Sequence, residues 1–362
     1  MLFNIEFDHG DALEGYVIPD GFSEIANLRV SDLNGEIGVF PCDQLRQAVV
    51  TAGRHQSGMV GYRLDGSKVP NIAECSTLTI HDAQSGLLIY RRPKVVAPIQ
   101  KKVIRLETQL LPLTRFDRYC GNYFHHELFS AERFGHETTL QVFHIDFTES
   151  IYVSGRLLMR NYEDFLGKGF EGIVLLADPY YEMALRLFLF KRMASTRINF
   201  LGERDKLILG PAIEYFAEAN LDDAGALRAL VKKAPLKVSN VLASPVARQF
   251  ACSSPDQRVS RGEIAAAIDM LSRFTIVGHH ADLPSFRDAV GEFLGIEADD
   301  LVIPPRQMLI EEIATKLKSV PTAEVLLEED LIFDYYVRQA LIPIDREDTT
   351  KDLKTHAVPP NR

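Results

Sequence analysis

The stretch that most constrains the fold is the apolar run at residues 172–176, which leads into Asp178 and Pro179. An uninterrupted apolar run that ends in Asp-Pro and precedes an amphipathic segment at 180–193 predicts a buried strand followed by a helix. Asp178 can cap that helix, and Pro179 fits its first turn. Strands buried on both faces belong to parallel sheets covered by helices, so the sequence predicts an α/β fold.

Further segments continue this alternation of strand and helix. The pattern predicts strands at 138–145 and 274–278, with a helix at 154–165 between the first of them and the run at 172–176. Residues 94–118 are typical of a connector that becomes helical, because prolines interrupt them. More helices are predicted at 211–218, 223–233, 261–273, 284–294, 307–319 and 323–340.

The first 95 residues show a different sequence pattern. Short strand-like runs alternate there with turn signals, of which Asn34-Gly35 is typical of a tight hairpin. This pattern favours a small β-sandwich. The predicted organisation is a β-sandwich at 1–95, a helical connector at 96–137, a larger α/β domain at 138–345 and a disordered tail at 346–362.

Composition excludes several classes of protein. The 40 Lys and Arg residues against 50 Asp and Glu give a net charge of −10, which counts against a general nucleic-acid binder. The four cysteines are widely spaced and form no CxxC pair, so we expect neither zinc nor disulfides. Neither a signal peptide nor an 18-residue apolar span is present, and we expect a cytoplasmic protein.

Common motifs of α/β enzymes are absent or misplaced. The sequence has no GxxxxGK[ST] loop and no GxSxG, which counts against an ordinary ATPase and an α/β-hydrolase. GKGFEG at 167–172 matches GxGxxG, but it follows a predicted helix and opens a strand, the reverse of a dinucleotide-binding turn. The histidine pairs at 125–126 and 279–280 lack a third ligand at suitable spacing, so no metal site is expected.

Two predicted helix starts carry groups suited to an anion. Asp178 lies where a predicted strand meets its helix, and ligands of open α/β sheets bind at such strand ends. The predicted helix at 154–165 begins with Ser154 and Gly155 and would place Arg156 and Arg160 on one face. A plain capped turn and a pair of solvated arginines remain the alternatives.

A third place is the serine-rich loop around residues 245–261. It contains Arg248, Arg258 and Arg261, an unusual concentration of positive charge in an acidic protein. Such a loop could close over an anionic ligand. A solvated loop is the alternative.

These three places, in this order, resemble the carbohydrate sulfotransferase superfamily. LLADP at 175–179 resembles that family's strand ending in Arg-Asp-Pro, and SPVAR at 244–248 is similar to its Asn-Pro-Gln-Thr-Arg segment. The family's next helix, its strand ending in Val-Gly, the helix after it and its closing element resemble residues 264–273, 274–278, 285–294 and 329–331. The resemblance covers about residues 138–340.

The resemblance implies a P-loop-like parallel sheet that binds 3′-phosphoadenosine 5′-phosphosulfate and transfers its sulfate to a glycan hydroxyl. The sequence departs from the family in three places. Ala177 stands where the family has the arginine that contacts the 3′-phosphate, and Leu185 stands where it has a serine. The Lys-Ser-Gly-Thr-like loop after the first strand is also absent.

Sulfuryl transfer needs positive charge at the bridging oxygen and a base for the acceptor hydroxyl. The resemblance assigns the charge to Arg156, with Arg160 as its alternative, and the base to His144, Asp146 or Glu149. The residues expected to bind the donor are Ser154, Gly155, Arg160, Asp178, Arg248, Arg258 and Arg261.

The N-terminal region, through GLLIYRR at 86–92, resembles the small β domains attached to bacterial surface-polysaccharide enzymes. The first hypothesis is therefore a sulfotransferase-like protein of surface-polysaccharide synthesis. It would act on a glycan or a lipid-linked saccharide, in association with a polysaccharide-synthesis complex. The alternatives are a noncatalytic binding or scaffold protein of the same pathway and an unusual glycosyltransferase.

Overall fold

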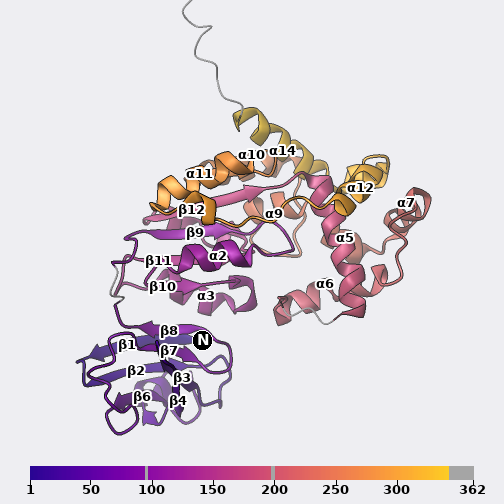
Figure 1. Cartoon of the computed structure of the whole chain (residues 1–362). Helices are drawn as coiled ribbons and strands as arrows, with labels where there is room; N and C mark the ends of the chain where they lie inside the picture. The colour runs from indigo at the N-terminus through magenta and orange to yellow at the C-terminus, as the bar shows by residue number, and fades with distance from the viewer. Residues whose placement is uncertain (94–96, 197–199, 342–362) are drawn as a thin grey trace, which may run out of the picture.

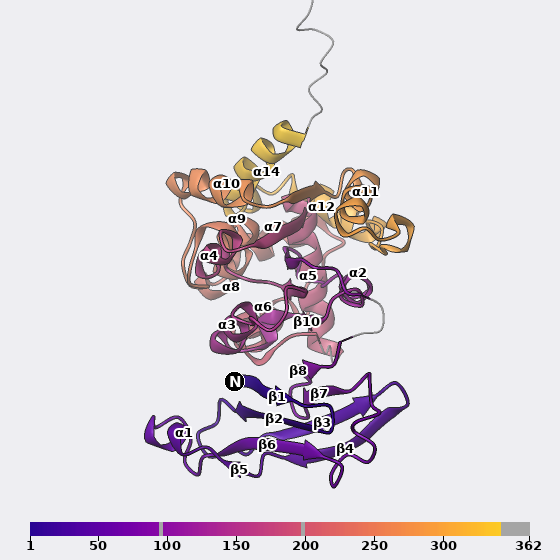
Figure 2. The ribbon, with the colours of Figure 1, turned by 90° about the vertical axis from the view of Figure 1, so that its left-hand side faces the viewer.

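The computed structural model describes residues 1–93, 97–196 and 200–341, which form a β part and an α/β part (Figures 1 and 2). Two antiparallel sheets make up the first part, and one parallel sheet with helices makes up the second. The predicted α/β fold with a smaller N-terminal β region is confirmed at this level. Within these residues no helix combines the length and the apolar character needed to cross a membrane.

The N-terminal part consists of two four-stranded sheets with the orders β1-β2-β6-β5 and β4-β3-β7-β8. Their buried faces share one hydrophobic cluster that includes Leu13, Val30 and Ile80, as in a sandwich. The predicted Asn34-Gly35 hairpin joins β3 to β4, with Asp32 paired to Gly35. The elements are β1 (Leu2–Asp8), β2 (Ala12–Ile18), β3 (Asn27–Asp32), β4 (Gly35–Pro41), β5 (Gln44–Leu45), α1 (Gln47–Thr51), β6 (Met59–Asp65), β7 (Thr79–Asp82) and β8 (Leu88–Arg91).

The second part is built on a five-stranded parallel sheet with the order β10-β11-β9-β12-β13. The first strand along the chain, β9, lies in the middle, and the later strands are added on its two sides. The strands are β9 (Lys102–Leu106), β10 (His126–Leu128), β11 (Ile151–Gly155), β12 (Phe170–Leu176) and β13 (Ile276–His279).

Helices cover both faces of this sheet. Helices α2 and α11 share a hydrophobic cluster with one face, and α3, α9 and α10 share a cluster with the other. The long helix α5 packs with α6, α7, α8, α12 and α13 in a separate helical core (Figure 1). The helices are α2 (Thr114–Gly121), α3 (His136–Phe143), α4 (Glu163–Leu166), α5 (Pro179–Ser195), α6 (Glu203–Phe216), α7 (Ala224–Lys233), α8 (Leu236–Leu242), α9 (Pro245–Ala251), α10 (Ile264–Ser272), α11 (Leu283–Leu294), α12 (Met308–Leu317), α13 (Pro321–Leu326) and α14 (Glu328–Leu341). Four 3₁₀ turns accompany them: η1 (Ala131–Arg133), η2 (Met159–Asn161), η3 (Arg261–Glu263) and η4 (Ala298–Asp300).

The two parts are joined through packed side chains. One hydrophobic cluster runs from the sandwich into the parallel sheet, and β8 lies against β10. Arg91 at the end of β8 makes two hydrogen bonds of 2.6 Å to the carboxylate of Glu127 on β10. A bidentate, partly buried pair of this kind fixes orientation as well as distance.

The strand and helix around the apolar run are confirmed. β12 and α5 occupy the predicted positions, and Asp178 caps α5 by accepting the N–H groups of Tyr180 and Tyr181. The predicted strand at 274–278 corresponds to β13, and most of the predicted later helices are present. The GxGxxG match follows α4 and opens β12, as expected of a turn without a dinucleotide.

The prediction for residues 94–118 is wrong in one essential respect. This expected helical connector, assigned to 96–137 in the domain division, contains β9, the central strand of the sheet. The charged Arg105 concealed the strand because it interrupts the apolar pattern. In the structure Arg105 is buried, and carboxylates neutralise it. The tail expected at 346–362 lies outside the described residues.

Two further predictions are wrong. The expected strand at 138–145 forms α3, whose buried residues Thr138, Thr139, Val142 and Phe143 lie on one helical face against β1. Packing overrides the strand propensity of its β-branched and aromatic residues. The expected helix at 154–165 contains the end of β11, then η2 and the short α4.

Candidate functional site

The candidate site lies at the carboxyl edge of the parallel sheet. Because β11 lies on one side of β9 and β12 on the other, the order of the chain reverses at β9. In open α/β sheets, ligands bind outside the strand ends at such a reversal. The segments that meet there are the loop after β9, the loop after β11 and the N-terminus of α5.

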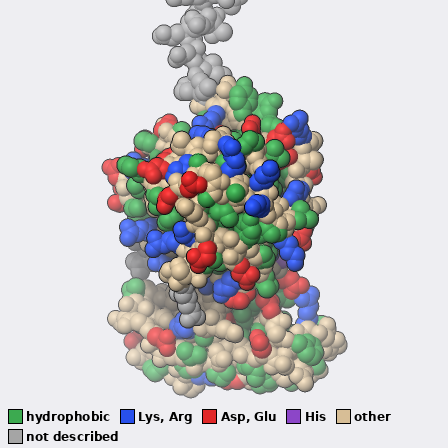
Figure 3. All heavy atoms as spheres, turned by 90° about the vertical axis from the view of Figure 1, so that its right-hand side faces the viewer, with side chains coloured by type: hydrophobic (Ala, Val, Ile, Leu, Met, Phe, Trp, Pro, Cys, Tyr) green, Lys and Arg blue, Asp and Glu red, His purple; other side chains and the backbone are tan. Residues whose placement is uncertain are grey.

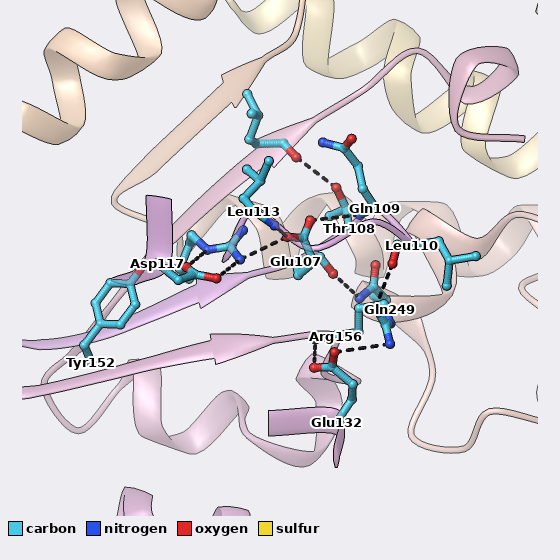
Figure 4. Close-up of polar contacts among 12 residues, drawn as sticks. Glu107, Thr108, Gln109, Leu110, Leu113, Asp117, Glu132, Tyr152, Arg156 and Gln249 are labelled. Carbon is cyan, nitrogen blue, oxygen red and sulfur yellow. Dashed lines mark hydrogen bonds and ion pairs between the residues drawn. The ribbon is translucent and has the colours of Figure 1, made fainter. Parts of the chain in front are cut away.

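The loop after β9 is closed by the protein's own carboxylates (Figure 4). Glu107 accepts hydrogen bonds from the backbone N–H groups of Gln109 at 3.1 Å and Leu113 at 2.9 Å. Glu182, from α5, accepts a third from the N–H of Leu110 at 3.0 Å. In a phosphate-binding loop, N–H groups of this kind point at the anion. Here a side-chain carboxylate already occupies each of these three.

A buried ion cluster supports this loop from within the sheet. Arg105 on β9 lies 3.0 Å from Glu107 and donates at 2.6 Å to Asp117 on α2. The hydroxyl of Tyr152 donates to the same Asp117 at 2.8 Å. Burial raises the pKa of Glu107, and Arg105 opposes that effect. The cluster therefore fixes α2 and the loop to the central strand.

Glu182 has a second partner, Arg186, one turn further along α5. The Arg186 Nε donates to Glu182 at 2.8 Å. Burial raises the pKa of Glu182 to about 7, although Arg186 opposes the shift. Arg186 is therefore an arginine that is paired within its own helix.

A cavity of about 550 Å³ lies beside the carboxyl end of β11. The segment from η1 to α3, the loop after β11 and helices α5, α6, α8 and α9 contribute to its wall. Its volume lies within the range of small-molecule sites. Four arginines and two carboxylates line it: Arg156, Arg186, Arg204, Arg248, Glu132 and Asp205. With Glu182, which pairs with Arg186 from outside the wall, four arginines face three carboxylates, so a small surplus of positive charge remains at the cavity.

Arg156 connects two parts of the cavity wall with the loop after β9, and Figure 4 shows its contacts with Glu132 and Leu110. Its backbone N–H donates to Glu132 at 2.8 Å, and its Nη1 donates to the carbonyl of Leu110 at 3.0 Å. Its Nη2 pairs with Asp205 of α6 and lies 3.2 Å from the other oxygen of Glu132. Burial alone would lower the pKa of Arg156, but these two carboxylates raise it. Arg156 is thus a permanent cation that is already paired.

Other groups in the cavity wall lack partners. Gln249 donates from Nε2 to the carbonyl of Glu107 at 2.8 Å, but its buried Oε1 has no hydrogen bond. Arg248 donates to two carbonyls at the end of α8, and its Nε is buried without a partner. Arg204 makes no side-chain hydrogen bond or ion pair with any described residue. Buried unpaired polar atoms are costly, so Gln249 Oε1 and Arg248 Nε indicate a place for a polar ligand, whereas Arg204 is exposed to solvent.

The structure separates the residues expected to be catalytic. His144, Asp146 and Glu149 precede β11 and lie at its amino end, where Glu149 pairs with Lys102 at 3.0 Å. Arg156 follows the carboxyl end of the same strand. Since a strand rises about 3.3 Å per residue, β11 places the expected bases roughly 17 Å from Arg156. They cannot act with it on one acceptor.

The residues expected at the start of a helix belong to other elements. Ser154 and Gly155 end β11, and the buried Oγ of Ser154 has no partner. Arg160 lies in η2 and pairs with Glu163 at 2.8 Å. Arg160 therefore does not share a helical face with Arg156, and it does not line the cavity.

The remaining expected residues are divided in the same way. Asp178 lies at the predicted strand–helix junction, but it caps α5. Of the three loop arginines, Arg248 alone lines the cavity. Arg258 donates from Nε to Asn240 at 2.7 Å, and Arg261 pairs with Glu328 on α14.

Sequence reasoning missed Glu107, Glu132 and Gln249. Glu107 was missed together with β9, and nothing local distinguishes Glu132 or Gln249 from other polar residues. Glu182 and Arg186 carried a readable signal, because they are four residues apart on a predicted helix.

Comparison of the chain with protein-family models, with curated protein sequences and with solved structures gave no match. Function therefore has to be inferred from the geometry of the cavity and of the loop after β9. The cavity offers positive charge and unpaired polar groups, whereas the N–H groups of the loop are already bonded to carboxylates.

Proposed function

We propose that the protein binds an acidic saccharide in the cavity beside β11, as a noncatalytic, sulfotransferase-like member of a surface-polysaccharide pathway. The observation that carries this proposal is the surplus of arginine over carboxylate in the cavity wall, next to the unpaired Oε1 of Gln249. Arginine favours carboxylate, phosphate and sulfate groups, and neutral polar side chains suit hydroxyl groups.

The order of elements supports a P-loop-like sheet of the sulfotransferase kind. Strand β12 leads into α5 through Asp178, as LLADP implies. Helix α10, strand β13 with Val277-Gly278 and helix α11 follow in the expected series. The segments SPVAR and EDL also meet, because Asp330 on α14 accepts the N–H groups of Val246 and Ala247 at the start of α9.

The loop after β9 favours binding without sulfate transfer. Its N–H groups at Gln109, Leu110 and Leu113 are held by Glu107 and Glu182. A phosphosulfate at this position would have to displace two buried carboxylates and would be repelled by them. The cavity beside β11 is the part of the site that remains open to a ligand.

The direct test is isothermal titration calorimetry of the full chain with matched sugars. Galacturonate and N-acetylglucosamine 6-sulfate carry a negative charge, whereas galactose and N-acetylglucosamine do not. We expect the acidic sugars to bind and their neutral counterparts to bind at least tenfold more weakly. Equal affinity for charged and neutral sugars, or no binding of either acidic sugar, would contradict the proposal.

Two residues of α6 provide a matched pair of variants. Arg204 lines the cavity, and Lys206 is equally exposed on the same helix but pairs with Glu203 away from it. Arg204→Gln should weaken acidic-sugar binding about tenfold, because it removes a charge-assisted hydrogen bond. Lys206→Gln should leave the affinity unchanged.

Sulfuryl transfer from 3′-phosphoadenosine 5′-phosphosulfate is the second candidate. It is favoured by Arg338 and Lys318, which lie 3.3 and 4.0 Å from Asp178 and supply positive charge near Ala177. A donor site should be stabilised by 3′,5′-phosphoadenosine but not by adenosine monophosphate. At a hundredfold excess over Kd the gain is about 2.7 kcal/mol, a shift of roughly 5 °C or more in Tm. The absence of that shift would exclude the donor site and leave saccharide binding as the remaining proposal.

A further inference from the structure

A second cavity, of about 300 Å³, lies where the sandwich meets the α/β part. On the sandwich side, the turn between β7 and β8 contributes Ser85 and Gly86 to its wall. On the other side, α2 contributes Thr114 and Arg118, and the segment after β10 contributes Arg133. Sites for small molecules are often found at such junctions between domains.

This second cavity also has unbalanced positive charge. The two carboxylates in its wall are Asp117, which pairs with Arg105, and Glu127, which pairs with Arg91. Its two arginines, Arg118 and Arg133, have no side-chain hydrogen bond or ion pair within the described parts of the chain. An anionic group in the second cavity would therefore meet two uncompensated guanidinium groups.

The two cavities flank the short segment around η1. Phe134 lines both of them, Glu132 lines the first, and Ser130 and Arg133 line the second. A 3₁₀ turn rises about 2 Å per residue, so the four steps from Ser130 to Phe134 span roughly 8 Å. Figure 3 shows that the molecule narrows where its two parts meet and that side chains of both charges lie along this waist.

We infer that the ligand is an acidic oligosaccharide that crosses the η1 segment and fills both cavities. This inference rests on the proposed function and extends it from one sugar to a chain. A repeating acidic sugar presents anionic groups at intervals and hydroxyl groups between them. The arginines of the two cavities can bind the anionic groups, and the hydroxyls of Thr114 and Ser130 can bind the hydroxyl groups of the sugar. The net charge of −10 counts against a nucleic acid as the extended anion.

Calorimetry with galacturonate and with its 1,4-linked tetramer tests this inference on the full chain. The tetramer should bind at least tenfold more tightly than the monomer. Arg118→Ser and Arg133→Ser should each weaken tetramer binding about tenfold and leave monomer binding unchanged, because a single sugar occupies the first cavity. Arg115, exposed on the same helix α2 but outside the cavity, provides the control. Arg115→Ser should change neither affinity.

The outcomes separate the two proposals. Equal affinity for monomer and tetramer, with Arg204→Gln still weakening both, overturns the extended site and keeps the single-sugar site. Equal effects of Arg115→Ser and Arg118→Ser also overturn it, since they would indicate a diffuse charge effect. A protein that binds neither sugar overturns both proposals. The thermal unfolding of each variant verifies that it is folded.

Discussion

The loop after β9 and the cavity beside β11 lie at the same edge of one sheet, yet they differ in whether their polar groups have hydrogen-bond partners within the protein. In the loop, the N–H groups of Gln109, Leu110 and Leu113 all have an internal carboxylate partner. In the cavity, Gln249 Oε1 and Arg248 Nε have none. The N–H groups of the first region are satisfied without a ligand, whereas these two polar atoms of the second region are not.

The comparison distinguishes charged groups that stabilise the fold from charged groups that are available to bind a ligand. Arg105 and Arg156 are both buried arginines at strand ends, but each is enclosed by carboxylates. Arg204 is exposed and has no ion-pair partner among the residues that the structure describes. The number of arginines in a region is therefore a poor guide to a binding site, and their pairing is a better one.

The largest effect is expected on the loop side, from Arg105→Met. This change leaves Glu107 and Asp117 buried without their counter-ion, which should lower the free energy of unfolding by about 3 to 5 kcal/mol. Chemical denaturation measures the loss. Lys102→Met on the same strand is the control, because its partner Glu149 is mostly exposed and the loss should be about 1 kcal/mol or less. Equal losses would mean that the Arg105 cluster is not a structural unit.

A smaller effect is expected from the pH dependence of Glu182. The folded protein holds this proton more tightly than the unfolded chain, since the pKa rises from 4.5 to about 7. The stabilisation is therefore largest below pH 4.5 and is lost as the pH rises towards 7. The unfolding free energy of the wild type, minus that of Glu182→Gln, should fall by about 2 to 3 kcal/mol between pH 5 and pH 8. A flat difference would show that Glu182 titrates normally.

The smallest effect is expected on the cavity side, from Gly155→Ala. A Cβ at this position would lie 2.5 Å from both the backbone N of Ala131 and Oε2 of Glu132. The change should cost about 2 kcal/mol and release Glu132 from the N–H of Arg156. Gly135→Ala is the control, because its nearest neighbour is 3.7 Å away and the change should cost less than about 0.5 kcal/mol. Chemical denaturation of both variants measures the two losses in the free energy of unfolding.

The sequence was most informative where local signals and packing agree. The β12–α5 unit was predictable because an uninterrupted apolar run leads into Asp178 and Pro179, which begin a helix without help from distant residues. The Asn34-Gly35 hairpin was predictable for the same reason. Arg156 and Arg248, both selected from the sequence, line the same cavity, although Arg156 was assigned to the wrong element.

The sequence was least informative where a distant residue changes the meaning of a local pattern. Arg105 reads as a surface residue until Asp117, twelve positions later, neutralises it inside the sheet. The same applies to Thr138 and Val142, whose strand propensity gives way to packing on β1. With β9 unrecognised, the loop that begins at Glu107 could not be placed, and His144 was assigned to the wrong edge.

The continuous core between β8 and β10, fixed by Arg91 and Glu127, has a consequence for selectivity. It gives the joint between the two parts little freedom to open. The distance between Gly86 of the sandwich and Arg118 of α2, which face the second cavity from its two sides, is therefore set by the fold. For the proposed oligosaccharide ligand, a second cavity of fixed width would select by the size of the sugar as well as by its charge.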